Sequence, residues 1–406
     1  MARTTPAARV TTSAGQLKYK APSSAEWRNL FVDAKAENQE LENKNVKASF
    51  EALKDSLLTS LQMQNLIILT GCGTSRSAGG PTMLDLWKAA IGTPPSEIAV
   101  QVAGTIKYDL ATPAPNIEDF LSRCDAYLQI EDDLAVKGLV EHSKKEILEK
   151  CSSFLENKEL DGHKTFLHRL SRRRVRDSRL KIFSTNYDLC FERAAGEIGL
   201  VVIDGFSFTQ PRFFDPRFFC YDIVRRPRSS EDQGSYLEGV FLLYKLHGSV
   251  NWAHTPEGRV VEKQNPEPSE ACLTYPAKGK YQQSFLQPNL EMVSQYFAAL
   301  REPNTCLIVT GFGFNDDHLA EPILSAVRSN PHLRLIIADY AAEDFINGKS
   351  GPSRYWKELA DLSREGEDIW FINASFSDFT KLVPDLKSLS PADKLMKDIK
   401  NITGGR

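Results

Sequence analysis

The segment LIILTGCGTS, residues 66–75, decides the fold of this 406-residue chain, because it joins a short apolar run to a glycine turn. An unbroken apolar run of this length is typical of a strand that is buried on both faces of a parallel sheet. Glycines directly after such a strand let the backbone turn tightly and approach a pyrophosphate, and a following helix offers free N–H groups to the anion. We therefore predict a nucleotide-binding turn, which is made by Gly71, Gly73, Thr74 and Ser75.

Apolar runs of the same kind recur along the rest of the chain. They lie at residues 181–184, 200–203, 243–246, 306–309, 333–338 and 369–372. Each run is too short for a helix, and helical stretches lie between most of them. This alternation predicts an α/β fold with a Rossmann-like, mainly parallel sheet.

Composition narrows the classes of function. Lys plus Arg is 50 and Asp plus Glu is 53, so the net charge is -3 and no global basic field favours direct binding of nucleic acid. No apolar run approaches the roughly 18–20 residues that a membrane helix needs. The N-terminus also lacks the apolar core of a signal peptide. We therefore expect a cytoplasmic globular protein without a membrane partner.

The cysteines argue against a disulfide framework and against zinc. There are seven, an odd number, at wide spacings, and no C-x-x-C pair occurs. Structural zinc sites usually need such pairs. We therefore expect no metal site and no zinc ribbon, and reduced thiols suit a cytoplasmic location.

The sequence divides into three parts. Residues 1–24 are rich in Ala, Thr, Ser and Pro, carry basic side chains and no acid, and are predicted to be a flexible basic arm. Residues 25–380 are predicted to form the main domain, with a helical pattern from about residue 26 to residue 64. A helical lobe is expected at 116–177, inserted into that domain, and residues 381–406 are expected to be a C-terminal tail.

Two further strand ends carry polar side chains. Asn186 and Asp188 follow the run at 181–184, and His247 follows the run at 243–246. Ligands of open α/β sheets bind outside the carboxyl ends of the strands. Asn186 can bond a ribose hydroxyl or a water, and His247 can act as a general base. The alternatives are an Asx turn at Asn186 and a histidine with no catalytic role.

A second glycine-containing turn follows the run at 306–309. Gly311, Phe312 and Gly313 are predicted to let the backbone approach a sugar, while Asn315 and Asp316 could equally cap the next helix. Asp339 stands at the end of the following run. Its carboxylate is placed to bond ribose hydroxyls, and a role in the turn is the alternative.

These four motifs, taken together and in this order, resemble the sirtuin family over roughly residues 50–375. Gly71 to Pro81 match the opening motif G-A-G-x-S-x-x-A-G-I-P except at Cys72 and Gly80. Thr185, Asn186 and Asp188 match the T-x-N-x-D element, His247 and Gly248 match the catalytic histidine-glycine, and Gly311 to Gly313 match the strand end that holds the adenosine ribose. The sequence departs from the family at Thr82-Met83-Leu84, which replace Asp-Phe-Arg, and in lacking the zinc-binding cysteine pairs.

The resemblance implies an NAD-binding domain that attacks the nicotinamide–ribose bond. The motif set is similar to the sirtuin-like domains of bacterial anti-phage defence systems, which are mostly NAD hydrolases, and to the subunit that pairs with a HerA-type hexameric ATPase. On this basis NAD is the substrate, Asn186 and His247 are catalytic, Asp188 supports the Asn186 loop, and a homo-oligomer is expected. The products are nicotinamide and ADP-ribose, and NAD depletion is the expected role in defence.

Other functions remain open at this point. An NAD-dependent protein deacylase would need an acyl-lysine channel, which the missing zinc module and Thr82-Met83-Leu84 argue against. A subunit that senses NAD or ADP-ribose without turnover would not need both Asn186 and His247. A scaffold subunit would depend on the arm and on the helical lobe.

Overall fold

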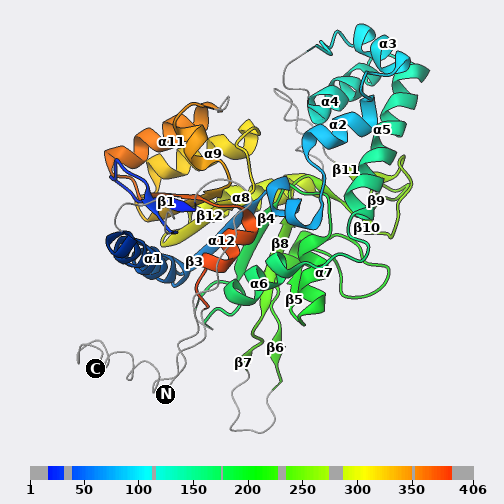
Figure 1. The fold of residues 1–406 in the computed structure, drawn as a ribbon. Helices are drawn as coiled ribbons and strands as arrows, with labels where there is room; N and C mark the ends of the chain where they lie inside the picture. Colours follow the sequence, from blue (N-terminus) through cyan, green and yellow to red (C-terminus); the bar gives the residue numbers. More distant parts are fainter. Residues whose placement is uncertain are drawn as a thin grey trace.

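The structure is a computed structural model. It describes residues 17–31, 39–111, 116–174, 177–226, 235–273, 287–349 and 353–385. Most of the predicted arm and tail, residues 1–16 and 386–406, lie outside these ranges. Figure 1 shows a large sheet flanked by helices, with a separate group of helices standing over one of its edges.

All seven predicted apolar runs are strands, and all seven are parallel neighbours in one sheet. The predicted α/β fold with a mainly parallel sheet is therefore confirmed. The order of the nine-stranded sheet is β2-β1-β14-β13-β12-β3-β4-β8-β5. The parallel strands are β3 (Asn65–Thr70), β4 (Leu180–Ser184), β5 (Val201–Ile203), β8 (Val240–Lys245), β12 (Thr305–Thr310), β13 (Leu333–Asp339) and β14 (Ile369–Asn373).

The chain order reverses at β3. From β3 the chain adds β4, β5 and β8 on one side, and it later adds β12, β13 and β14 on the other. Thr70 and Thr310 are in register at the ends of β3 and β12. A crevice at such a switch point, outside the carboxyl ends of the strands, is where open α/β sheets bind their ligands.

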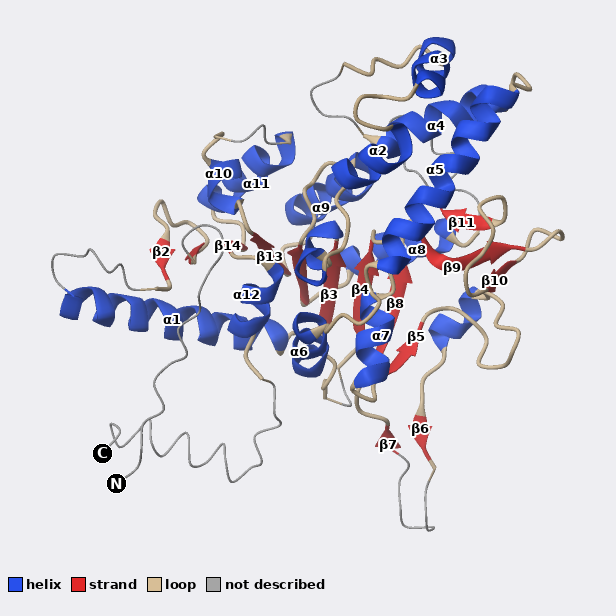
Figure 2. Ribbon diagram, turned by 45° about the vertical axis from the view of Figure 1, so that its right-hand side comes forward, coloured by secondary structure: helices blue, strands red, loops and turns tan. Residues whose placement is uncertain are grey.

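Helices cover both faces of the sheet (Figure 2). Apolar side chains of β3 alternate between the two faces, because Leu66 and Ile68 belong to one buried cluster and Ile67 and Leu69 to the other. The first cluster includes side chains of α1 (Gln39–Leu61), α6 (Asp161–Leu170), α7 (Cys190–Glu197) and α12 (Phe376–Leu382). The second includes side chains of α8 (Asn289–Arg301), α9 (Asp317–Ser329), α10 (Ala342–Ile346) and α11 (Arg354–Glu365).

The helical lobe has a core of its own. Its helices are α2 (Met83–Ile91), α3 (Glu97–Thr105), α4 (Ile117–Leu128) and α5 (Leu134–Ser153). The lobe helices run from residue 83 to residue 153, whereas the predicted boundaries were 116–177. The lobe ends earlier than predicted because α6 packs on α7 and α12 and not on the lobe. Apolar positions predict each helix, but which core it joins depends on contacts between distant parts of the chain.

The N-terminal edge of the sheet differs from the prediction. Residues 18–20, expected in the arm, form β1 (Lys18–Lys20), which pairs antiparallel with β14. Residues 28–29, expected in a helix, form β2 (Arg28–Asn29), and the helix begins only at Gln39. Tyr19 is 1% exposed and stacks on Trp370, so tertiary packing outweighs the local composition here.

The remaining elements are two small sheets and three short 3-10 helices. A three-stranded sheet holds β9 (Gly248–His254), β10 (Val260–Glu262) and β11 (Ala271–Leu273), and β6 (Val224–Arg225) with β7 (Ser235–Tyr236) forms a hairpin that projects from the body (Figure 1). Short 3-10 helices are η1 (Cys72–Thr74), η2 (Arg76–Ala78) and η3 (Pro216–Cys220). In the described part of the chain, no helix is both long enough and apolar enough to cross a membrane.

Candidate active site

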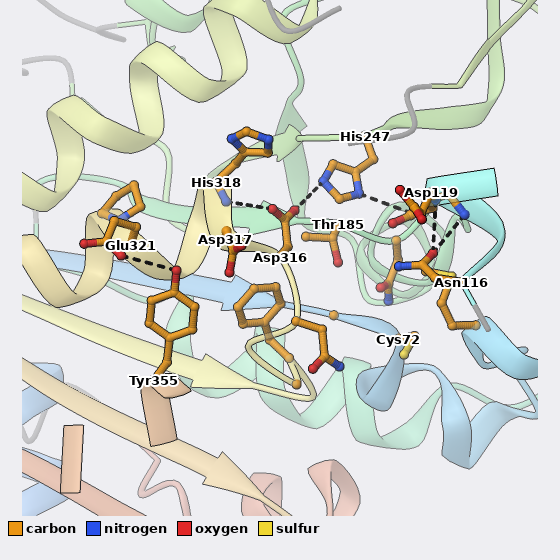
Figure 3. A pocket seen from close by; sticks show the side chains of 18 of the residues that line it. Cys72, Asn116, Asp119, Thr185, His247, Asp316, Asp317, His318, Glu321 and Tyr355 are labelled. Carbon is orange, nitrogen blue, oxygen red and sulfur yellow. Dashed lines mark hydrogen bonds and ion pairs between the residues drawn. The ribbon is translucent and has the colours of Figure 1, made fainter. Parts of the chain in front are cut away.

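A cavity of about 1510 Å³ opens at the carboxyl edge of the sheet, between the strand ends, the lobe and α9. Typical small-molecule pockets measure roughly 300–1,000 Å³, so this one has room for a dinucleotide. Many predicted site residues line it: Gly71, Asn186, Asp188, His247, Gly311, Phe312 and Gly313. Figure 3 shows His247 and Asp316, which both line this cavity, pointing toward each other.

Four other predicted residues do not line the cavity. Gly73, Thr74 and Ser75 lie in the glycine turn, where Thr74 and Ser75 are buried. Asp339 is 6% exposed at the end of β13, and its Oδ1 accepts a hydrogen bond of 2.9 Å from the Ala341 N–H. This contact matches a role in the turn, which is the alternative that the sequence predicts for Asp339.

The backbones of the two glycine turns, after β3 and after β12, are in direct contact. The Gly73 N–H donates to the Gly311 carbonyl oxygen at 3.0 Å. A Cβ at Gly73 would stand 2.6 Å from the Gly311 Cα, and Gly311 itself has a φ of +63°. The first turn continues into η1 and η2, and the first α-helix after it, α2, begins at Met83 with Thr82 as its N-cap. The helix N-terminus predicted directly after the turn is therefore not there, and the N–H groups of Gly73, Thr74 and Ser75 donate to carbonyl oxygens of the protein.

Asn186 lines the cavity and has one side-chain oxygen without a hydrogen-bond partner. Its Nδ2 donates to Thr74 Oγ1 at 3.2 Å and to Ser75 Oγ at 3.0 Å, which fixes the orientation of the amide. Its Oδ1 is buried and has no hydrogen-bond partner among the described residues. Buried polar atoms are nearly always hydrogen-bonded, so an unpaired acceptor on a residue that lines the cavity is a candidate partner for a ligand donor.

Asp188 ties the Asn186 loop to the glycine turn. Its carboxylate accepts a 2.7 Å hydrogen bond from Ser75 Oγ and a 3.0 Å bond from the Cys190 N–H. The Lys245 ammonium donates to the Asp188 carbonyl oxygen and lies 3.5 Å from a Glu192 carboxylate oxygen. Through these contacts Asp188 fixes the loop that carries Asn186, as a supporting role for Asp188 requires.

His247 lies between two carboxylates. Its Nε2 is 3.2 Å from Asp316 Oδ2, and its Nδ1 is 3.8 Å from Glu118 Oε1. Burial lowers the pKa of His247, but the hydrogen bond to Asp316 and the negative charge of Glu118 outweigh it, so the pKa is raised. The imidazole is thus poised to hold a proton between two acids.

The packing of Phe314 fixes the turn that places Asp316 next to His247. Phe314 is fully buried and adopts the left-handed conformation, with φ of +56°, which is rare for a large side chain. Its ring packs edge-on against Phe312 and Trp356. Asp316 then caps α9 by accepting from the His318 N–H at 2.9 Å. The predicted cap at Asp316 is therefore present, and the same carboxylate reaches the site.

Sequence reasoning missed Glu118 and Tyr187. Glu118 lies in the first turn of α4, and its Oε1 accepts a 3.0 Å hydrogen bond from the Tyr187 hydroxyl. Burial raises the pKa of Glu118. An acid in a first helical turn is ordinarily a dipole partner, so the sequence carried no signal that this one meets His247.

The described residues offer no cluster of three or more His, Cys, Asp or Glu side chains that could hold a metal ion. All seven cysteines are free thiols.

Residues 180–359 match the model of the SIR2-like domain. This stretch, less than half of the chain, contains Asn186, His247 and Gly311 but not the first glycine turn. The match supports the resemblance to the sirtuin family and, in general terms, an NAD-dependent activity. No curated protein matches the sequence.

Solved structures of Sir2 homologues are similar over most of the chain. One is a Sir2 homologue–NAD complex, with 12% identity and a TM-score of 0.43, covering 81% of this chain and 92% of that one. Another is a mutant Sir2 homologue with ADP ribose, with 15% identity and a TM-score of 0.44, covering 83% and 98%. A third is a mutant complex with 2'-O-acetyl ADP ribose, with 14% identity and a TM-score of 0.43, covering 83% and 97%.

Proposed function

We propose that the protein is an NAD hydrolase that cleaves the nicotinamide–ribose bond and releases nicotinamide and ADP-ribose. The observation that carries this proposal is that Asn186 and His247 line one cavity at the switch point of the sheet. The two residues come from strand ends about 60 positions apart in the sequence, and they are the pair that the sirtuin resemblance implies.

The leaving group explains why so few catalytic groups suffice. Nicotinamide leaves NAD as a neutral molecule from a cationic precursor, so it needs no protonation, and the ribose acquires oxocarbenium character as in glycoside hydrolysis. Asn186 Oδ1, the unpaired acceptor, orients a ribose hydroxyl or the attacking water. Water then forms the new C–O bond as the C–N bond breaks, and His247 takes the proton that the water loses.

Carboxylates around the site favour that transition state. Glu118, Asp188 and Asp316 all line the cavity, and Glu118 and Asp316 flank the imidazole. Negative groups stabilise positive charge that develops on the ribose, more strongly where water is excluded. The backbone of the Gly71 turn is the proposed place of the pyrophosphate, and the Gly311–Gly313 turn that of the adenosine ribose.

Nicotinamide release from NAD by the full chain tests the proposal. Asn186→Ala and His247→Ala should each lower turnover by about 10²–10⁴-fold, the usual range for a general acid–base group. His332→Ala, a change at an exposed histidine, is the matched control and should leave turnover unchanged. Turnover that persists in both site variants contradicts the mechanism. An added acetyl-lysine peptide separates a hydrolase from a deacylase, because a deacylase releases nicotinamide only with the peptide.

We further propose that NAD depletion serves anti-phage defence in the cytoplasm and that the chain works as a homo-oligomer with a HerA-type hexameric ATPase. This part is supported by the resemblance of the motif set alone. The test is nicotinamide release with and without the purified ATPase, together with the mass of the complex by light scattering. A mixture that neither associates nor changes turnover contradicts the pairing.

A further inference from the structure

Glu118 reaches His247 from a different part of the molecule than the other site residues. Asn186, His247 and Asp316 follow strands of the central sheet, whereas Glu118 belongs to α4 of the helical lobe. Its Oε1 is 3.8 Å from His247 Nδ1, and both side chains are about nine-tenths buried. The lobe therefore contributes a carboxylate next to the base of the proposed reaction.

The position of Glu118 is fixed by two independent contacts. Its backbone N–H donates to the Asn116 side chain at 2.9 Å, which anchors the first turn of α4. Its carboxylate accepts from the Tyr187 hydroxyl at 3.0 Å. A carboxylate that is held at both its backbone and its tip loses little further freedom when it orients a neighbour.

Tyr187 connects the core of the helical lobe to the loop that carries Asn186. Its ring belongs to the core cluster of the lobe, and it stands between Asn186 and Asp188 in the sequence. Its backbone carbonyl accepts from the Val250 N–H, and Val250 belongs to the same cluster. The docking of the lobe and the shape of the Asn186 loop thus depend on the same residue.

We propose that Glu118 is a positioning residue supplied by the helical lobe: Asp316, 3.2 Å from Nε2, holds the proton on that nitrogen of His247, and the Glu118 carboxylate stabilises the imidazolium that forms when Nδ1 accepts the proton from the attacking water. A neutral imidazole has one N–H and one lone pair, and the partner of one nitrogen decides which is which. The inference rests on the proposed hydrolase for its catalytic consequence. The tautomer itself can be measured without turnover.

The groups that face His247 come from three elements. Glu118 lies on α4, Asp316 on the turn before α9, and the Tyr187 ring on the loop after β4, 6.5 Å away between centroids. Glu118→Gln keeps an acceptor for Tyr187 but removes the charge next to Nδ1. Glu141→Gln makes the same chemical change at an exposed side chain of α5, in the same lobe and outside the cavity lining, and is the matched control.

The test is a pH titration of the full chain labelled with 15N-histidine, in which the His247 signals are assigned by their loss in His247→Gln. In the wild type we expect the neutral form to carry its proton on Nε2, next to Asp316. Glu118→Gln should move the His247 titration to lower pH and leave the Nε2–H tautomer in place. Glu141→Gln should match the wild type, and Glu118→Asp should return the titration toward it. An unchanged titration in Glu118→Gln, or a neutral form with its proton on Nδ1, overturns the inference.

Turnover then reports the catalytic consequence. In Glu118→Gln we expect kcat for nicotinamide release to fall about tenfold, part of the 10²–10⁴-fold that a general base supplies, with KM for NAD within about twofold. A fall in Glu141→Gln of the same size contradicts the positioning role. If the wild type shows no turnover under any condition, the hydrolase is refuted, and the titration alone decides whether Glu118 stabilises the protonated His247. Tyr187→Phe loses the hydroxyl that holds Glu118. It should lower the His247 titration midpoint and kcat, as Glu118→Gln does, but by smaller amounts.

Discussion

The carbonyl oxygen of Gly311 lies 2.6 Å from the point at which a Cβ on Gly71 would stand. The turns after β3 and β12 are therefore in direct backbone contact at the switch point of the sheet. Glycine is needed at this position because any side chain would meet backbone, which cannot rotate away as a side chain can.

Gly71→Ala should separate the two turns and weaken nucleotide binding. The new methyl group would contact both the Gly311 carbonyl oxygen and the Phe312 Cα, at 2.6 and 3.0 Å, so the turns must move. Overpacking of this kind costs about 1–3 kcal/mol. We expect a lower Tm and at least tenfold weaker binding of ADP-ribose by calorimetry. Gly104→Ala is the control, since a Cβ there meets nothing within 4 Å, and binding equal to that control would contradict the prediction.

The parallel sheet was predictable because each of its seven parallel strands is a mainly apolar run at a strand length. Edge strands give no such signal: β1 and β2 are two or three residues long, and Tyr19 is buried through its contact with Trp370. The sheet also brings Asn186 and His247 together, because parallel strands end at one edge. Glu118 lies some 130 positions before His247, and no local pattern links the two. Its role follows only from how the lobe docks.

Ser75→Ala should impair catalysis through Asn186. The Ser75 hydroxyl donates to Asp188 at 2.7 Å and accepts from Asn186 Nδ2 at 3.0 Å, so the variant leaves two buried polar groups short of a partner. Such a loss costs about 1–3 kcal/mol in stability. We expect a lower urea midpoint and a kcat for nicotinamide release that falls several-fold. Ser77→Ala, at an exposed serine of the same turn, should behave as the wild type. Equal behaviour of the two variants would show that the hydroxyl does not position Asn186.

Asp316→Asn should shift the pH dependence of turnover to lower pH. The hydrogen bond to Asp316 helps to raise the pKa of His247, and a general base works only in its neutral form, above its pKa. Removing the charge therefore frees the base at lower pH. Asparagine also caps helices, so α9 should keep its N-terminus.

The measurement is kcat/KM for NAD from about pH 5 to 9, since this ratio reports the pKa of the free enzyme's essential base. Asp317→Asn removes one charge from the next residue, which also lines the cavity, and should leave the acid limb in place. If the acid limb of the kcat/KM profile is unchanged in Asp316→Asn, or moves to higher pH, a neutral His247 is not the base.

Asp339→Asn distinguishes the two roles left open for that residue. Burial raises the pKa of the Asp339 carboxyl to about 6, although the Ala341 N–H bond opposes this. Between pH 4 and 6 the folded state then binds more protons than the unfolded state, so this group makes the protein less stable as pH rises. One pKa unit corresponds to about 1.4 kcal/mol. The neutral amide can still accept from Ala341, and the variant should therefore gain stability over the wild type at pH 7 and not at pH 4, in urea unfolding at both values. Because Asp339 lies outside the cavity lining, KM for NAD should not change. A higher KM with no pH-dependent gain in stability would instead support the ribose contact predicted from the sequence.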